Sequence, residues 1–475
     1  MSRLTSSFVL FTFLMAASST MAVNVAIEDF NDKTAGTLDG QGGGTGWTGN
    51  WTAGAAYQTV ISGANLSYAF SGGQTISGGD KALELSSPDT GDHGDVAHRQ
   101  LASTVSDEKL YFSFLLKRTG GSSTSGLDFA MLWLDDDLGS GSTAHSDFPN
   151  IGVYEPGPGG NHIMARTQYP GANTQWAVAG GSSNTTSTEL IVGRLTKGNN
   201  ATYQGDYDRW DIWAFDSASP GSVLDFRTPH DSTNAPGGDM GAFDYIGARI
   251  VQFEADDKIV YDELRVGTQL TDAVPTIVGI TLDEVQQAKV LDFESAPNGP
   301  ISSTDPLFRD FGIIEVSATG GSASGDVQNQ NGQTGKALFY NGSQFLILPQ
   351  DSDPFDNSAW PFGDNQTFRL DFAAHYNQFG LSFQDQTNQD FTFTFYQSGV
   401  EMGSIVEYSG STVNDMFIYE TPFFFNRVTI DGAVSTDGFG IDNIVLGIGV
   451  PEPATVVLMG LGGLALLGLV RRRRS

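Results

Sequence analysis

The sequence predicts an all-β protein, because short apolar runs recur between turn-forming residues. Clear examples are KLYFSFLLK (109–117), RWDIWAF (209–215) and FTFTFY (391–396). Glycine is abundant, with 59 residues, and the body of the chain shows no long stretch of helical periodicity. Many short strands joined by glycine-rich turns are typical of sandwiches and barrels.

Two β modules are predicted, and their ends match. The first, residues 23–270, opens with AIEDFND and closes with IVYDELRVGTQL. The second, residues 288–449, opens with VLDFESA and closes with DGFGIDNIVLGI. Two jelly-roll sandwiches would share such ends if the first and last strands lie close together in each. Residues 271–287, which contain Pro275, are the expected linker between them.

The N-terminal segment has the three parts of a signal peptide. Arg3 precedes the apolar run FVLFTFLMAA (8–17), and small residues then lead to Ala22. Residues 1–22 are therefore expected to direct export by the Sec translocation machinery.

The C-terminal segment, residues 450–475, is expected to be a membrane-associated signal. Residues 454–470 carry no charge and would form a helix just long enough to cross a hydrocarbon core of ~30 Å. The cluster that follows would stay on the cytoplasmic side, leaving the rest of the chain outside; it consists of Arg471, Arg472, Arg473 and Arg474.

A Pro-Glu-Pro tripeptide, formed by Pro451, Glu452 and Pro453, stands directly before the apolar run. Tripeptide, apolar helix and arginine cluster in this order resemble the PEP-CTERM sorting signal. The resemblance implies a bacterial protein first held in the inner membrane and then cut by an exosortase. It also implies a final place at the cell surface or in the extracellular matrix.

The first module resembles concanavalin A-like or laminin-G-like jelly rolls. The resemblance is carried by GGGTGWTGNWT (42–52), DRWDIWAF (208–215) and DKIVYDELRVG (257–267). The second module resembles smaller all-β modules that precede PEP-CTERM signals, through residues 378–399 and 437–447. Its phenylalanines are expected in the core, notably Phe311, Phe383, Phe391, Phe393, Phe395 and Phe439.

Composition excludes several functions. The formal net charge of −31 argues against nucleic acid as a partner. The absence of cysteine removes thiol catalysis and thiolate metal sites, and the six histidines show no zinc-binding spacing.

A hydrolase is the third hypothesis for function. Glycosidases need two carboxylates at the scissile bond, and the E-x-D-x-x-E or E-x-D-x-E run of hydrolases with this fold is absent. Asp206 and Asp208 share one face of a predicted strand, but no glutamate accompanies them. The protein is therefore expected not to be an enzyme.

Glycan binding is the leading hypothesis, since exposed aromatic rings stack on sugars beside polar groups. The candidates are Trp47, Trp51 and Tyr57 in the Gly-rich stretch, and Tyr154, Tyr169 and Trp176 in the loops around 150–180. The other interpretation of each ring is core packing. Under the binding hypothesis, Trp47→Ala and Trp51→Ala would abolish glycan retention, whereas a structural surface protein without a specific ligand would be unaffected.

Calcium is the one cofactor considered, because clustered carboxylates suit it and an acidic chain could use it. The candidate ligands are Asp135, Asp136, Asp137 and Asp442. No D-x-D-x-D-G loop is present, and turn-forming, solvated aspartates are the alternative interpretation.

Overall fold

The structure is a computed structural model, and it describes most of the chain between the two terminal segments. The described residues are 24–53, 57–70, 75–87, 93–120, 128–136, 149–155, 162–167, 175–179, 187–198, 205–218, 224–233, 240–253, 256–285, 287–293, 299–302, 305–319, 336–340, 345–349, 367–384, 389–409, 416–432 and 440–447.

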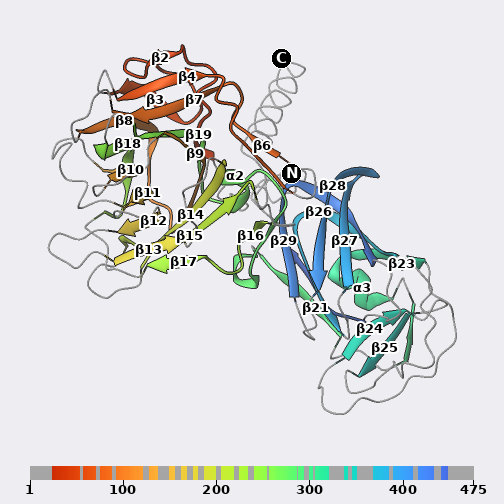
Figure 1. The fold of residues 1–475 in the computed structure, drawn as a ribbon. Coiled ribbons are helices and arrows are strands. Elements are labelled where there is room, and N and C mark those ends of the chain that lie inside the picture. Colours follow the sequence, from red (N-terminus) through yellow and green to blue (C-terminus); the bar gives the residue numbers. More distant parts are fainter. Residues whose placement is uncertain are drawn as a thin grey trace, which may run out of the picture. The chain divides into compact units, whose positions relative to one another are not determined.

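The first module is a sandwich of two antiparallel sheets (Figure 1). Among the described residues, one sheet has seven strands. In spatial order they are β13 (Gln175–Ala179), β12 (His162–Thr167), β11 (Asn150–Glu155), β10 (Asp128–Asp135), β18 (Phe243–Phe253), β8 (His93–Val105) and β3 (Trp47–Thr52).

The second sheet of this sandwich has nine strands within the described ranges. They are β17 (Asp231–Thr233), β15 (Tyr207–Asp216), β14 (Glu189–Lys197), β9 (Lys109–Gly120), β19 (Lys258–Gly267), β7 (Lys81–Ser86), β4 (Gln58–Ser62) and β2 (Gly36–Thr37), with β1 (Asn24–Glu28) paired to β19. The first and last strands of the module are thus neighbours, as the matching ends predicted. A separate hairpin joins β5 (Ser67–Ala69) and β6 (Thr75–Ser77).

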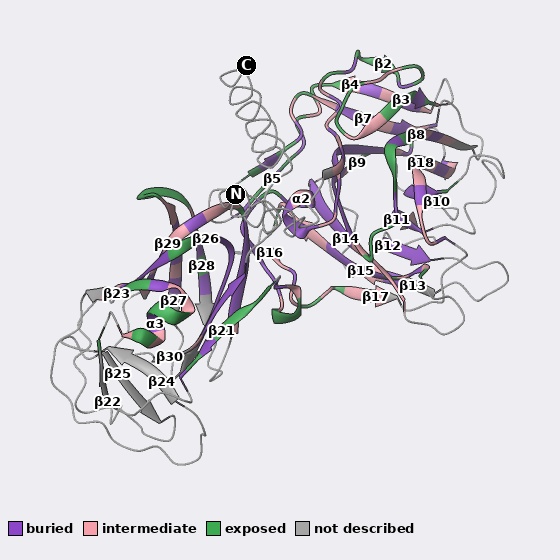
Figure 2. Ribbon diagram, turned by 180° about the vertical axis from the view of Figure 1, so that it is seen from behind, coloured by how far each residue is buried: buried purple, intermediate pink, exposed green. Residues whose placement is uncertain are grey.

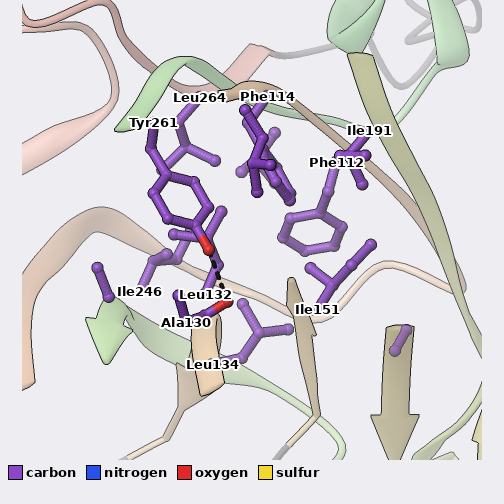
Figure 3. Close-up of a cluster of buried hydrophobic side chains, with 14 of the residues drawn as sticks. Phe112, Phe114, Ala130, Leu132, Leu134, Ile151, Ile191, Ile246, Tyr261 and Leu264 are labelled. Atoms are coloured by element: carbon purple, nitrogen blue, oxygen red, sulfur yellow. Dashed lines mark hydrogen bonds between the residues drawn. The ribbon is translucent and has the colours of Figure 1, made fainter. Parts of the chain in front are cut away.

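Alternate residues of each strand fill the space between the two sheets. Ala130, Leu132 and Leu134 of β10 point into this core and meet Phe112 and Phe114 of β9 (Figure 3). The Tyr261 hydroxyl of β19 donates a hydrogen bond to the Ala130 carbonyl at 2.6 Å, so one polar contact crosses the apolar layer. Burial raises the pKa of Tyr261, which keeps this hydroxyl a donor.

The nine-stranded sheet is buried on its other face as well, which explains its long apolar runs. Tyr111 and Leu115 of β9 lie in a separate apolar cluster with Val274 and Val278. Trp210 and Trp213 of β15 point to opposite faces, and both are fully buried.

The second module is built on a twelve-stranded sheet, counted over the described residues. Its main path runs β16 (Leu224–Asp225), β20 (Val278–Gly279), β29 (Met416–Gly432), β26 (Thr367–Gln384), β30 (Gly440–Gly447), β24 (Lys336–Tyr340), β25 (Phe345–Pro349) and β22 (Gly299–Ile301). The branches are β21 (Lys289–Asp292) on β30, β23 (Ile313–Thr319) on β26, and β27 (Gln389–Gln397) between β28 (Val400–Ser409) and β29.

Two long strands, β26 and β29, each pair with different neighbours along their length. The first part of β26 pairs with β23 and the second part with β30. Their mutual register breaks between Asp371 and Gln378, opposite a stretch of β29 that contains Pro422. Proline has no N–H to donate, so it is accommodated where the ladder is already interrupted.

The aromatic core of this module confirms part of the phenylalanine prediction. Phe391, Phe393 and Phe395 alternate along β27, so their rings share a face, and all three are fully buried. Phe311 packs against the same core while partly buried. Phe439 lies outside the described residues, as does the side chain of Phe383.

The segment expected to be the linker is largely buried (Figure 2). It contains α2 (Leu270–Ala273), β20 and the short 3-10 helix η1 (Leu282–Glu284). β20 pairs with β16, which comes from within residues 23–270, and with β29 of the second module. The two modules therefore share strands as well as an apolar cluster, and residues 24–448 form one compact unit.

Buried polar contacts reinforce this connection. Glu420 of β29 accepts hydrogen bonds from the Thr271 hydroxyl at 2.6 Å and the Gln378 amide at 2.8 Å. Burial raises the pKa of Glu420, and these two donors counteract the shift. Arg194 of β14 pairs with both Asp211 and Glu284, tying η1 to the nine-stranded sheet.

The all-β prediction is confirmed. The described α-helices are α2 and α3 (Pro306–Phe311), both short. α3 begins after Asp305, whose carboxylate accepts from the Leu307 N–H at 2.9 Å, and ends at Gly312, whose φ of 111° suits glycine.

Removing one aromatic ring from the core of the second module should lower the stability of the fold. Phe393→Ala deletes a fully buried ring packed between Phe379 and Tyr419, so we expect a loss of about 3–5 kcal/mol in the free energy of unfolding. Val400→Ala on the same hairpin, at a side chain that is 64% exposed, is the control. Urea unfolding followed by tryptophan fluorescence measures both; equal effects would contradict this view of the core.

Candidate functional site

The two tryptophans of the Gly/Trp stretch both lie on β3, but they do not form an exposed sugar platform. Trp51 is only 2% exposed and belongs to the first core, so its expected exposure is wrong. Trp47 is partly buried, and its N–H donates to the Ile27 carbonyl at 3.0 Å. The two rings lie 5.8 Å apart, and the Arg99 guanidinium lies 5.2 Å from the Trp47 ring.

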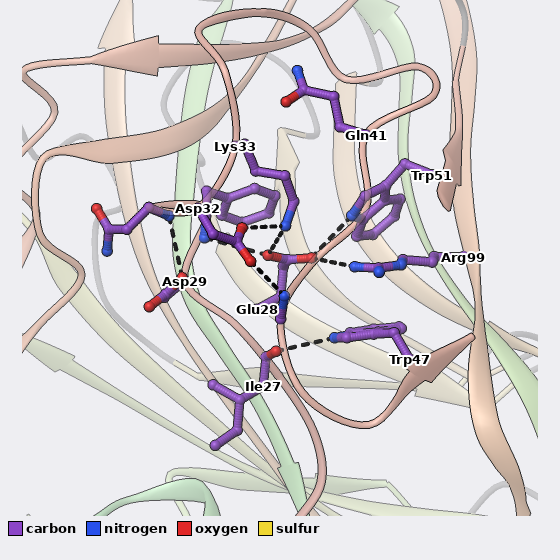
Figure 4. A network of polar contacts seen from close by, with 12 residues as sticks. Ile27, Glu28, Asp29, Asp32, Lys33, Gln41, Trp47, Trp51 and Arg99 are labelled. Carbon is purple, nitrogen blue, oxygen red and sulfur yellow. Dashed lines mark hydrogen bonds and ion pairs between the residues drawn. The ribbon is translucent and has the colours of Figure 1, made fainter. Parts of the chain in front are cut away.

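Trp51 is held inward by a buried glutamate. Glu28, at the end of β1, is fully buried and accepts from Trp51 Nε1 at 3.1 Å (Figure 4). Its carboxylate also meets Arg99 Nη1 at 2.7 Å and Lys33 Nζ at 2.7 Å. Every oxygen of Glu28 is thus paired, and the Gly/Trp stretch is fastened to the first strand.

Of the other predicted aromatic candidates, the structure describes Tyr57 and Tyr154 in full and Trp176 only through its backbone, and Tyr169 lies outside the described residues. Tyr57 is partly buried and packs against the first core. Trp176 lies on β13 opposite Arg166, but its side chain is outside the described part of the structure.

The predicted calcium ligands are not brought together by the described residues. Asp135 ends β10 and is buried, whereas the next residue, Asp136, is exposed. Asp137 lies outside the described residues, and so does the side chain of Asp442 on β30. The prediction at these positions stays a prediction.

A different set of residues lies together on the outer face of the seven-stranded sheet. Because alternate residues of its strands point into the core, the intervening ones share the opposite face. The register places them in transverse rows. One row holds Arg166, Asn150, Trp133, Gly247 and His98, and the next holds Met164, Gly152, Met131 and Arg249.

Aromatic rings and guanidinium groups dominate this outer face. Phe129 and Tyr154 stack with ring centroids 5.2 Å apart and an interplanar angle of 21°. The Arg166 guanidinium lies 5.4 Å from the Phe129 ring and donates from Nε to Asn150 Oδ1 at 3.0 Å. Phe129 and Tyr154 stay partly exposed, so this stacked pair is accessible.

Two nitrogens on this face are buried without a hydrogen-bond partner. They are the indole N–H of Trp133 and the Nε–H of Arg249. Trp133 lies so closely over Gly247 that a Cβ there would come within 2.2 Å of its ring. Since buried donors are nearly always paired, two unpaired donors on neighbouring strands mark a place for an acceptor.

Electrostatics on this face favours a negative group. Burial, and the positive charge of Arg249, lower the pKa of Arg166 to about 10. Burial lowers the pKa of Arg249 too. Within the described residues Arg249 forms no ion pair. The guanidinium groups of Arg166 and Arg249 therefore repel each other, although the protein as a whole is acidic.

The sequence carried a weak signal for this site. DFAMLWLDD (128–136) alternates, and the positions that do not face the core include Trp133. The partnership with Arg249 depends on the pairing of β10 with β18, which no local pattern indicates.

The sorting segment matches a known motif. Residues 449–474 match the PEP-CTERM protein-sorting motif, so the chain carries the C-terminal signal of an exported protein. The tripeptide, the apolar run and the arginine cluster all lie outside the described residues. In the described part, no helix has the length and apolar character needed to cross a membrane.

No curated protein matches the sequence of this chain. Among solved structures, a carbohydrate esterase of the Shiga toxin-encoding bacteriophage phi24B is 13% identical, covers 52% of this chain and 99% of its own, and has a TM-score of 0.31. The Emp47p carbohydrate recognition domain is 7% identical, with coverages of 53% and 99% and a TM-score of 0.30. The Ca²⁺/Man2-bound VIP36 exoplasmic/lumenal domain is 10% identical, with coverages of 50% and 88% and a TM-score of 0.30.

Glu28 should matter for stability. Glu28→Ala leaves the buried Arg99 and Lys33 without their shared carboxylate, so we expect a loss of about 3–5 kcal/mol in the free energy of unfolding. Chemical denaturation measures it, with Asp310→Ala, whose side chain is 76% exposed, as control. A loss below about 1 kcal/mol would show that the network does not hold the Gly/Trp stretch in place.

Proposed function

We propose that this protein is an exosortase-processed surface or matrix protein whose first sandwich binds an acidic polysaccharide. The binding site is the outer face of the seven-stranded sheet, centred on Arg249, Trp133 and the stacked pair of Phe129 and Tyr154. The observation that carries the proposal is the pair of unpaired donors beside accessible aromatic rings.

The sorting motif supports the place of action. A PEP-CTERM motif implies processing by an exosortase after export, and the released protein would then meet extracellular polymers. Polysaccharides outside the cell are therefore ligands that the protein would encounter at high local concentration.

The chemistry of the face supports a sugar as ligand. Sugar rings stack on aromatic side chains, and their hydroxyl oxygens accept hydrogen bonds from fixed donors. Phe129 and Tyr154 offer the stacking surface, while Trp133 Nε1 and Arg249 Nε offer donors that have no partner within the described residues.

The two arginines support an acidic sugar over a neutral one. A carboxylate or sulfate group between Arg166 and Arg249 would relieve their mutual repulsion. The net charge of −31 repels a polyanion over long range, so attraction must come from these local groups.

The alternatives are a structural surface protein with no specific ligand and a jelly-roll polysaccharide hydrolase. The first predicts that no polysaccharide is retained. The second predicts that reducing ends appear on incubation and that Asp208→Asn stops their release. We propose that the protein is not an enzyme, so binding should occur without release of reducing ends.

Substitutions on this face should weaken binding without weakening the fold. We expect Arg249→Gln to raise the dissociation constant for alginate or polygalacturonate about tenfold or more, because a charge-assisted contact is lost. Trp133→Phe keeps a ring but removes the N–H, and we expect a loss of about threefold to tenfold. Affinity electrophoresis of the purified full chain, with dextran as the neutral polymer, measures these changes.

Arg309→Gln is the matched control, since this arginine is 67% exposed on α3 and far from the sheet in sequence. Thermal melting of each variant checks the fold. Unchanged binding by both Arg249→Gln and Trp133→Phe would contradict the proposed site. Failure of the unchanged protein to bind any polymer would contradict the proposed function.

A further inference from the structure

Another unpaired group lies in the other sheet of the first sandwich, in its last strand, β19. Asp262 of β19 is fully buried. One of its oxygens, Oδ1, accepts from the Glu263 N–H at 2.8 Å, but Oδ2 has no partner. An oxygen that is buried and unpaired in this way is rare in native proteins and calls for a hydrogen-bond donor or a cation beside it.

Asp262 is surrounded by other carboxylates. The pairing of β1 with β19 places Glu28 opposite Leu264, so Glu28 and Asp29 come close to Asp262. Burial, followed by the negative charges of Glu263, Asp29 and Glu28, raises the pKa of Asp262 to about 9. A cation beside Asp262 would offset these negative charges.

The nearby side-chain cations already have partners. Lys33 and Arg99 pair with Glu28, and Arg265 pairs with Glu263 at 2.6 Å. Lys81 donates to the backbone carbonyls of Asn31 and Lys33. Within the described residues, neither Asp29 nor Asp262 forms an ion pair, so two carboxylates remain without a counter-charge.

Asp29 belongs to an acidic group with Glu28 and Asp32. Single oxygens of Glu28, Asp29 and Asp32 lie within 4.8 Å of one another. The Lys33 ammonium lies 2.7 Å from both Glu28 and Asp32, so it already neutralises that pair. Asp29 has no ion pair within the described residues, and its negative charge acts on Asp262.

The Asp262 carboxylate lies against the backbone of Gly78, a position that only glycine can occupy. At Gly78 a Cβ would lie 1.8 Å from Asp262 Oδ2, so no side chain could stand there. The Gly78 carbonyl, which accepts from Asn31 Nδ2 at 2.5 Å, adds a further oxygen to the neighbourhood.

We infer that Asp29 and Asp262 bind a divalent cation, with Ca²⁺ as the ion that the oxygen donors favour. A cation between the two side chains would pair Oδ2 and neutralise both carboxylates. Flexible sets of carboxylate and carbonyl oxygens suit Ca²⁺, while Mg²⁺ demands a near-ideal octahedron. This site is distinct from the candidate residues Asp135, Asp136, Asp137 and Asp442.

The test is titration of CaCl₂ into the chelator-treated full chain, followed by calorimetry and thermal melting. We expect Asp262→Asn and Asp29→Asn each to bind one Ca²⁺ fewer than the unchanged protein. Saturating Ca²⁺ should raise the melting temperature of the unchanged protein by about 5 °C or more, since a ligand that binds only the folded state stabilises it. MgCl₂ should give a smaller rise.

Asp262→Asn is close in shape to the protonated acid, so the variant is expected to fold and to lose only the response to Ca²⁺. Asp310→Asn, at an exposed carboxylate, is the matched control and should keep the full response. Calcium binding that persists in both Asp262→Asn and Asp29→Asn would overturn the inference. So would the absence of any calcium effect on the unchanged protein.

Discussion

The alternation of residues along β10 and β18 is the constraint on which the candidate site depends. Ala130, Leu132 and Leu134 face the core, so Met131 and Trp133 must face outward, and Arg249 follows from the burial of Ala248 and Ile250. A shift of one residue would turn every side chain to the other face. Core packing therefore fixes the positions of Trp133 Nε1 and Arg249 Nε, two hydrogen-bond donors that have no partner in the core.

Charge is organised differently where the first strand of the sandwich meets its last strand. There β1 pairs with β19, and Glu28 is enclosed with Arg99, Lys33 and the Trp51 N–H. This network makes the Gly/Trp stretch part of the framework. The same pairing brings Asp29 toward Asp262, so this part of the sandwich contains one paired buried charge and one unpaired carboxylate oxygen.

The sequence predicted features that depend on local pattern. The alternation of Phe391, Phe393 and Phe395 was enough to place them in a core, and the sorting segment was predicted from its order of tripeptide, apolar run and arginines. The burial of Trp51 could not be predicted, because its partner Glu28 is 23 positions away and Arg99 is 71 positions from Glu28. For the same reason the unpaired donors of Trp133 and Arg249 emerged only from the strand register.

The central claim is that polysaccharide binds to the outer face of the seven-stranded sheet. Hydrogen–deuterium exchange of the full chain, with and without saturating alginate or polygalacturonate, tests it most directly. The account predicts slower exchange in peptides from β10, β12 and β18, with the Gly/Trp stretch and the second module unchanged. Protection confined to β3 or to the second module, with none in these three strands, would contradict it.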